Sequence, residues 1–112
     1  MSMRSQTLLW VAQRASAAVL GLCVLVHLGI IIYAVRGGIS AAEILGRTQG
    51  NAGWLAFYSL FVLACAVHAP IGLRTVLNEW AAWRGRGCDT AMWLFAALLA
   101  WAGMRAVMAV TG

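Results

Sequence analysis

The chain has 112 residues, of which 63% are hydrophobic and only 10% are charged, and its formal net charge is +5. Soluble domains carry roughly a quarter charged residues, so this composition, with a mean hydropathy of +0.87, excludes an ordinary soluble protein. The basic residues are all arginines that lie near the ends of apolar runs. Their placement excludes a nucleic-acid-binding surface, which needs basic residues gathered on one face.

Three apolar runs, at about residues 10–35, 54–77 and 91–110, each come close to the ~20 residues that a helix needs to cross the hydrocarbon core of a bilayer. They predict an all-α integral membrane protein with three transmembrane helices in a single domain, residues 1–112. The first run is too long for the apolar core of a signal peptide and has no small-residue cleavage pattern after it. We therefore expect it to remain in the mature protein.

The arginines also predict the orientation in the membrane. They are most frequent around the start of the first run, at Arg4 and Arg14, and around the exit of the second, at Arg74, Arg84 and Arg86. Under the positive-inside rule these two regions face the cytoplasm. The N-terminus is therefore expected on the cytoplasmic side of a multi-pass protein.

The first run contains Arg14, Ser16 and His27. Arg14 can either extend to the lipid headgroups or contact a ligand, and Ser16 can bond a carbonyl of its own helix. His27 lies deeper. An ionisable side chain within the membrane is costly and marks a candidate functional site, and imidazole is a common ligand of haem iron. His27 is therefore either a packed core residue or a haem ligand.

The connection at residues 36–53 contains five glycines and several polar residues. This composition predicts a loop, with one helical turn at about residues 41–45. The third run is rich in alanine and has no titratable residue before Arg105, so we expect it to serve in packing.

The second run contains His68, the strongest candidate for a ligand site. Gly72 follows one turn later on the same face and leaves a notch where a flat ring or another backbone can approach. Pro70 removes a backbone donor and is expected to kink the helix beside this notch. Arg74 lies ~9 Å further along the helix, at a plausible distance for a haem propionate or, alternatively, for the lipid headgroups.

The two histidines differ by ~9 Å in expected depth, which argues against one iron shared by both. Each would then need a ligand from another chain, which implies up to two haems in a bundle of about six helices. The cysteines form no CxxC or CxxCH motif, so such a haem would be b-type and held without a covalent bond. The acidic residues all lie outside the runs, and we do not expect this chain to catalyse a reaction alone.

Two stretches, QRASAAVL in the first run and HAPIGLRTVLNEW in the second, resemble the membrane-anchor subunits (cytochrome b or hydrophobic anchor) of the succinate dehydrogenase and fumarate reductase family. The resemblance implies an anchor in the bacterial inner membrane that binds b-type haem and passes electrons between succinate and quinone. The implied partners are a flavoprotein, an iron-sulfur subunit and a second membrane anchor. Which of the two anchors this chain resembles more stays open.

The resemblance also implies roles for particular residues. His68 corresponds to the haem ligand of the family, and Arg14 and Ser16 correspond to positions that line its quinone pocket. Glu79 and Trp80 stand where family members often have aspartate and tyrosine. Trp80 is a departure, because indole only donates a hydrogen bond.

His27 resembles the ligand that the two-haem members carry late in the first span. Two alternatives remain beside this reading. One is a haem-free structural anchor, and the other is a small multidrug transporter, which normally has four spans and an intramembrane carboxylate.

Overall fold

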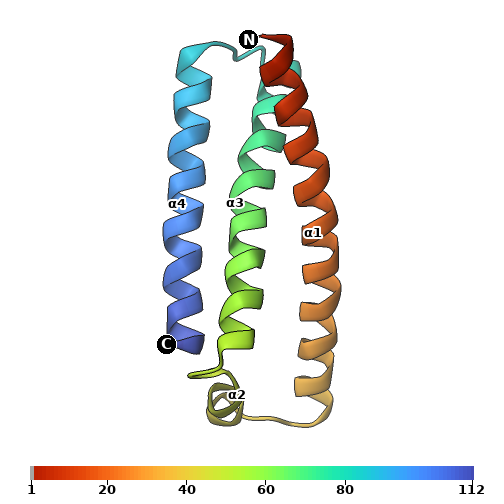
Figure 1. The fold of residues 1–112 in the computed structure, drawn as a ribbon, viewed down its shortest axis with the longest axis vertical. Coiled ribbons are helices and arrows are strands. Elements are labelled where there is room, and N and C mark those ends of the chain that lie inside the picture. Colours follow the sequence, from red (N-terminus) through yellow and green to blue (C-terminus); the bar gives the residue numbers. More distant parts are fainter. Residues whose placement is uncertain (1) are drawn as a thin grey trace.

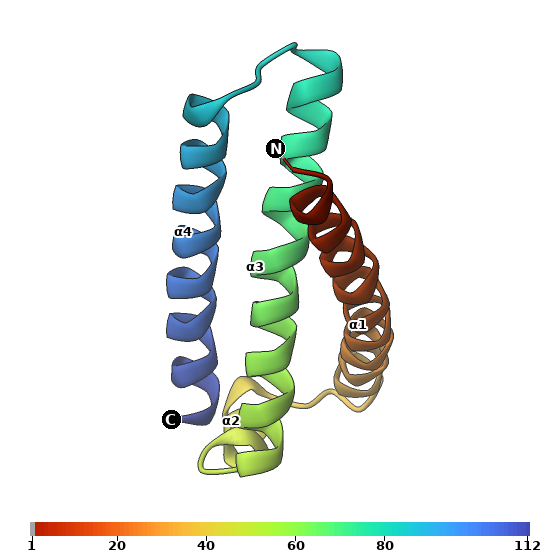
Figure 2. The same cartoon turned by 45° about the horizontal axis from the view of Figure 1, so that its top comes forward.

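The computed structural model describes residues 2–112. It contains the helices α1 (Met3–Arg36), α2 (Ala41–Thr48), α3 (Ala52–Trp80) and α4 (Arg86–Thr111). Figure 1 shows the three long helices side by side, with α3 in the middle. The N-terminus and the α3–α4 connection lie at one end, and α2 and the C-terminus lie at the other. Figure 2 shows that α1 leans away from α4, so that both pack mainly against α3.

The three long helices are each long and apolar enough to cross a membrane. Their large apolar side chains point outward, as at Leu22, Leu25 and Trp93, which are 69%, 67% and 77% exposed. So much apolar surface is unfavourable in water, whereas lipid solvates it without loss. The predicted fold class, an all-α integral membrane protein with three transmembrane helices, is confirmed. Each helix extends beyond its predicted run, and the exact depth of each span stays a prediction.

Helices α3 and α4 approach each other closely at Gly103. A Cβ atom at this position would lie 2.5 Å from Cγ1 of Val62. Helices in membranes pack through small residues, because close approach increases van der Waals contact where no hydrophobic effect separates helix from lipid. Gly103 therefore lets α4 lie directly against α3.

Helix α2 is longer than the single turn expected from the sequence. The Ser40 hydroxyl accepts from the backbone N–H of Glu43, whose carboxylate reaches back to Ser40, so the first turn has a capping box. At the other end of α2, Thr48 Oγ1 donates to the carbonyl of Val110 at 2.8 Å. The contacts at both ends stabilise α2, which Gly46 would otherwise weaken. The contact of Thr48 also fixes α2 across the end of α4.

Helix α3 continues without interruption through Pro70, which is buried. Proline has no N–H, so the carbonyl of Ala66 loses its usual partner one turn later. His68 lies between these two residues. The turn of α3 that lacks this hydrogen bond therefore contains the candidate ligand, and the kink expected at Pro70 stays a prediction.

Candidate functional site

His68 contacts α1 through Ser16. Its Nδ1 atom lies 3.4 Å from the Ser16 Oγ atom, and Ser16 is buried at 7% exposure. The same hydroxyl lies 3.1 Å from the backbone carbonyl of Gln13, to which it donates. The register of α1 against α3 thus brings two sequence-predicted residues together across a helix interface.

An open groove of about 580 Å³ lies beside this contact, between the N-terminal half of α1 and the C-terminal half of α3. It is amphipathic, with two arginines, two side-chain amides and a hydroxyl set among apolar side chains. It is lined by Gln6, Leu9, Trp10, Gln13, Arg14, Ala17, Ile71, Gly72, Arg74 and Thr75. The groove is large enough for part of a flat or chain-bearing ligand.

The notch predicted at Gly72 is present, but a side chain of α1 takes its space. A Cβ atom on Gly72 would lie 3.1 Å from Nε2 of Gln13. The Gln13 Oε1 atom is shielded from solvent and has no hydrogen-bond partner within residues 2–112. A buried carbonyl oxygen without a donor is unfavourable, so the Gln13 amide is held in this place at a cost.

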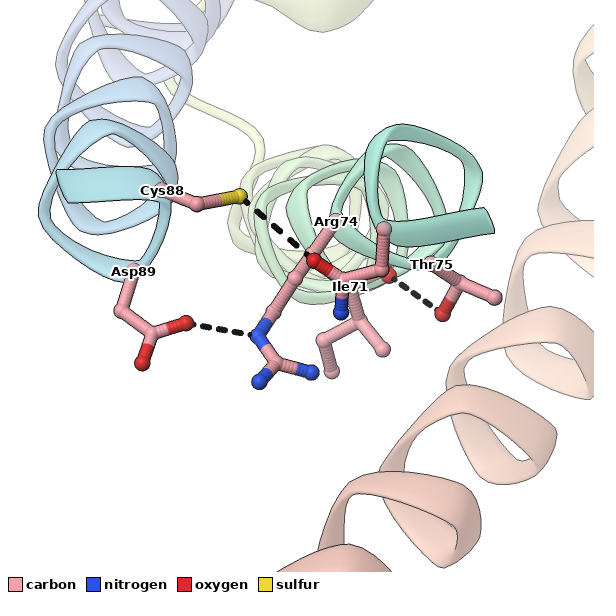
Figure 3. A network of polar contacts seen from close by, with 6 residues as sticks. Ile71, Arg74, Thr75, Cys88 and Asp89 are labelled. Atoms are coloured by element: carbon pink, nitrogen blue, oxygen red, sulfur yellow. Dashed lines mark hydrogen bonds and ion pairs between the residues drawn. The ribbon is translucent and has the colours of Figure 1, made fainter. Parts of the chain in front are cut away.

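Two arginines line the groove from opposite helices. The Arg14 guanidinium lies 5.3 Å from the ring centroid of Trp10, at cation–π distance. Arg74 Nε donates to Asp89 Oδ1 at 2.8 Å, and Figure 3 shows the guanidinium of Arg74 turned toward this first-turn residue of α4. Because a guanidinium has five N–H donors, one bond to Asp89 leaves Arg74 able to contact an anionic group as well.

Glu79 and Trp80 lie at the C-terminal end of α3, outside the lining of the groove. Glu79 is one turn beyond Thr75, a lining residue, and so shares its helical face. Trp80 is 85% exposed. Glu79 therefore lies one helical turn beyond the last lining residue of α3, and Trp80 is turned to the surroundings.

His27 lies at a different level and contacts aromatic rings. Its ring centroid is 5.9 Å from that of Tyr58 and 5.6 Å from that of Phe61, both edge to face. His27 follows Ser16, which marks the level of His68, by 11 residues along α1, a rise of ~16 Å. The offset exceeds the ~9 Å expected from the sequence, and the two histidines of one chain therefore do not face a common iron.

Sequence reasoning did not identify Gln13 and Asp89 as site residues. Gln13 carried a usable signal, because it is a polar residue in an apolar run, one turn before Ser16. Asp89 carried none, because its contact with Arg74 depends on how α4 returns against α3. Within the described part of the chain no three His, Cys, Asp or Glu side chains gather as a metal-binding cluster.

Three apolar helices with a polar groove at one end of the α1–α3 pair define a small multi-pass membrane subunit. The family model of the succinate dehydrogenase/fumarate reductase transmembrane subunit matches residues 1–104, and the chain belongs to this family. No curated protein and no solved structure matches the chain. The resemblance noted in the sequence is confirmed at the level of the family.

Proposed function

We propose that this chain is a membrane-anchor subunit of a respiratory succinate:quinone oxidoreductase, which binds b-type haem through His68 and contributes to a quinone site. The observation that carries the proposal is the position of His68: it lies beside an amphipathic groove and its Nδ1 atom is held by Ser16 at 3.4 Å. Family membership makes an electron-transfer role the natural use of such a site.

The residues around His68 fit a haem. A neutral imidazole can ligate iron through Nε2 while its other nitrogen is hydrogen-bonded. Arg74 would supply positive charge for a haem propionate, and Gly72 adds no side chain to the wall of the groove. Haem, when bound, would supply one-electron transfer between an iron-sulfur partner and quinone. The second axial ligand would come from a second membrane anchor.

His27 is a proposed ligand for a second haem. Its separation from the level of His68, ~16 Å along α1, gives room for two haems at different depths. The aromatic rings of Tyr58 and Phe61 pack edge to face against it, and within residues 2–112 no hydrogen bond occupies its nitrogens. A chain with one haem would instead use His27 for packing alone.

The quinone would bind in the groove with Arg14 as its main donor. A guanidinium donates strongly to a carbonyl oxygen that gains charge on reduction, and the neighbouring Trp10 supplies a flat apolar surface. Ser16, Glu79 and Trp80 are further candidates from the family pattern, although none of the three lines the groove. Of these, Glu79 lies closest along α3 to a residue that lines the groove, whereas Trp80 can only donate.

The partners would be a flavoprotein, an iron-sulfur subunit and a second anchor, assembled at the bacterial inner membrane. The end that holds the N-terminus and the α3–α4 connection carries Arg4, Arg84 and Arg86. The positive-inside rule places this end in the cytoplasm, where the soluble subunits would dock.

The test is a reduced-minus-oxidised spectrum of the purified complex, with haem quantified against covalent flavin. About one haem per flavin, lost in His68→Ala and retained in His27→Ala, supports ligation by His68 alone. About two, with one lost in each variant, supports both ligands. No haem in the wild-type complex would overturn the haem assignment and leave a haem-free structural anchor.

A further inference from the structure

The proton on the Ser16 hydroxyl determines which nitrogen of His68 is protonated. A serine hydroxyl has one proton to donate and two lone pairs that accept. The carbonyl of Gln13, 3.1 Å from Ser16 Oγ, can only accept, so the hydroxyl donates there. The oxygen is then left as an acceptor toward Nδ1 of His68, 3.4 Å away. For the contact with Ser16 to be a hydrogen bond in this arrangement, Nδ1 carries the imidazole proton.

The other ring nitrogen, Nε2, consequently has a lone pair that can bind a metal ion. A neutral imidazole has one N–H and one lone pair, so a proton on Nδ1 leaves the lone pair on Nε2. No contact of Nε2 with another polar atom is found for the described residues. The α1 helix thus sets the tautomer of a histidine on α3.

Ser16 itself does not line the groove. Its neighbours Gln13, Arg14 and Ala17 all do, whereas Ser16 is 7% exposed and faces α3. Ser16 therefore contacts His68, whereas a side chain that binds quinone in the groove would line it.

We propose that Ser16 is a positioning residue for His68, which fixes the imidazole in the Nδ1–H tautomer and directs Nε2 toward haem iron. The inference rests on the proposed function of His68 as a haem ligand. A partner that accepts from the non-ligating nitrogen holds the ring orientation and makes the imidazole a stronger ligand. A stronger ligand favours ferric iron, so the Ser16 contact lowers the reduction potential of the haem.

The experiment compares Ser16 variants in the whole purified complex, reconstituted in lipid. Ser16→Ala removes the acceptor, Ser16→Cys keeps a side chain of similar size with a weak acceptor, and Ser16→Thr keeps the hydroxyl. We expect Ala and Cys to raise the haem midpoint potential, shift the low-spin EPR signal and speed haem loss about tenfold or more. Thr should stay near the wild type in all three readouts.

Thr7→Ala is the matched control. Thr7 is on the same helix and its hydroxyl donates to the carbonyl of Met3 at 2.9 Å, one turn earlier. This variant removes a comparable local bond without touching His68. Its potential, EPR signal and rate of haem loss should equal those of the wild type.

Three results would overturn the inference. If Ala and Cys leave the potential, the EPR signal and haem loss unchanged, Ser16 does not position the ligand, although loss of haem in His68→Ala would still uphold the proposed function. If Thr behaves like Ala while Cys behaves like the wild type, side-chain volume is the cause. If His68→Ala keeps the low-spin haem, the ligand assignment and this inference fail together.

Discussion

Arg74 on α3 and Asp89 on α4 form an ion pair, with 2.8 Å between Nε and Oδ1, although 15 residues separate them in the chain. The pair joins two helices where Arg74 lines the groove. The ion pair holds the guanidinium of Arg74 toward α4, an orientation that α3 alone would not impose.

Asp89→Asn tests the consequence for the groove. The side chains of the pair are 24% and 40% exposed, so its loss should cost about 1 kcal/mol or less of stability. The released Arg74 should instead raise the KM for quinone. Steady-state quinone reduction and thermal unfolding of the complex measure the two effects. An unchanged KM with a large loss of stability would show that the pair only holds the helices together.

Gly72→Ala tests the close contact between α3 and α1. The added Cβ would meet Nε2 of Gln13 at 3.1 Å, so the amide must move and the wall of the groove changes. We expect the kcat/KM for quinone to fall, whereas dye-coupled succinate oxidation should stay unchanged. Gly29→Ala is the control, because its Cβ has no neighbour within 4 Å. Equal activity in the two variants would contradict a role for the Gln13–Gly72 contact.

Arg14→Ala should impair quinone reduction, because the groove loses a charged donor that strengthens its bond as quinone gains charge. The loss should reach about tenfold or more, since hydrogen bonds to charged groups contribute about 1.5–3 kcal/mol. Dye-coupled succinate oxidation should stay unchanged, and Arg14→Lys should recover part of the activity. Parallel loss of both activities would indicate misassembly of the complex.

Gly103→Ala should separate α4 from α3. Its Cβ would lie 2.5 Å from Cγ1 of Val62, and overpacking of this kind typically costs about 1–3 kcal/mol. Thermal unfolding of the complex measures the loss, and the double variant with Val62→Ala should recover most of it. Gly21→Ala, where a Cβ has open space, should be neutral. Equal melting temperatures for the Gly103 and Gly21 variants would refute the close helix contact.

The sequence by itself determined the three membrane helices. In lipid each backbone N–H and C=O must be paired within its own segment, and the length of an apolar run sets whether it can cross. Both properties are local to each run. The candidate ligands His27 and His68 were also visible in the sequence, because a histidine within an apolar run is costly wherever the helix lies.

The tertiary structure alone decided which of these residues meet. The contact of Ser16 with His68, the ion pair of Arg74 with Asp89 and the placing of the Gln13 amide over Gly72 depend on the rotation and register of neighbouring helices. A lipid-facing and a protein-facing side of such a helix are both apolar, so periodicity in the sequence does not distinguish them. Close packing at small residues sets the register, and that register makes separate polar residues into one site.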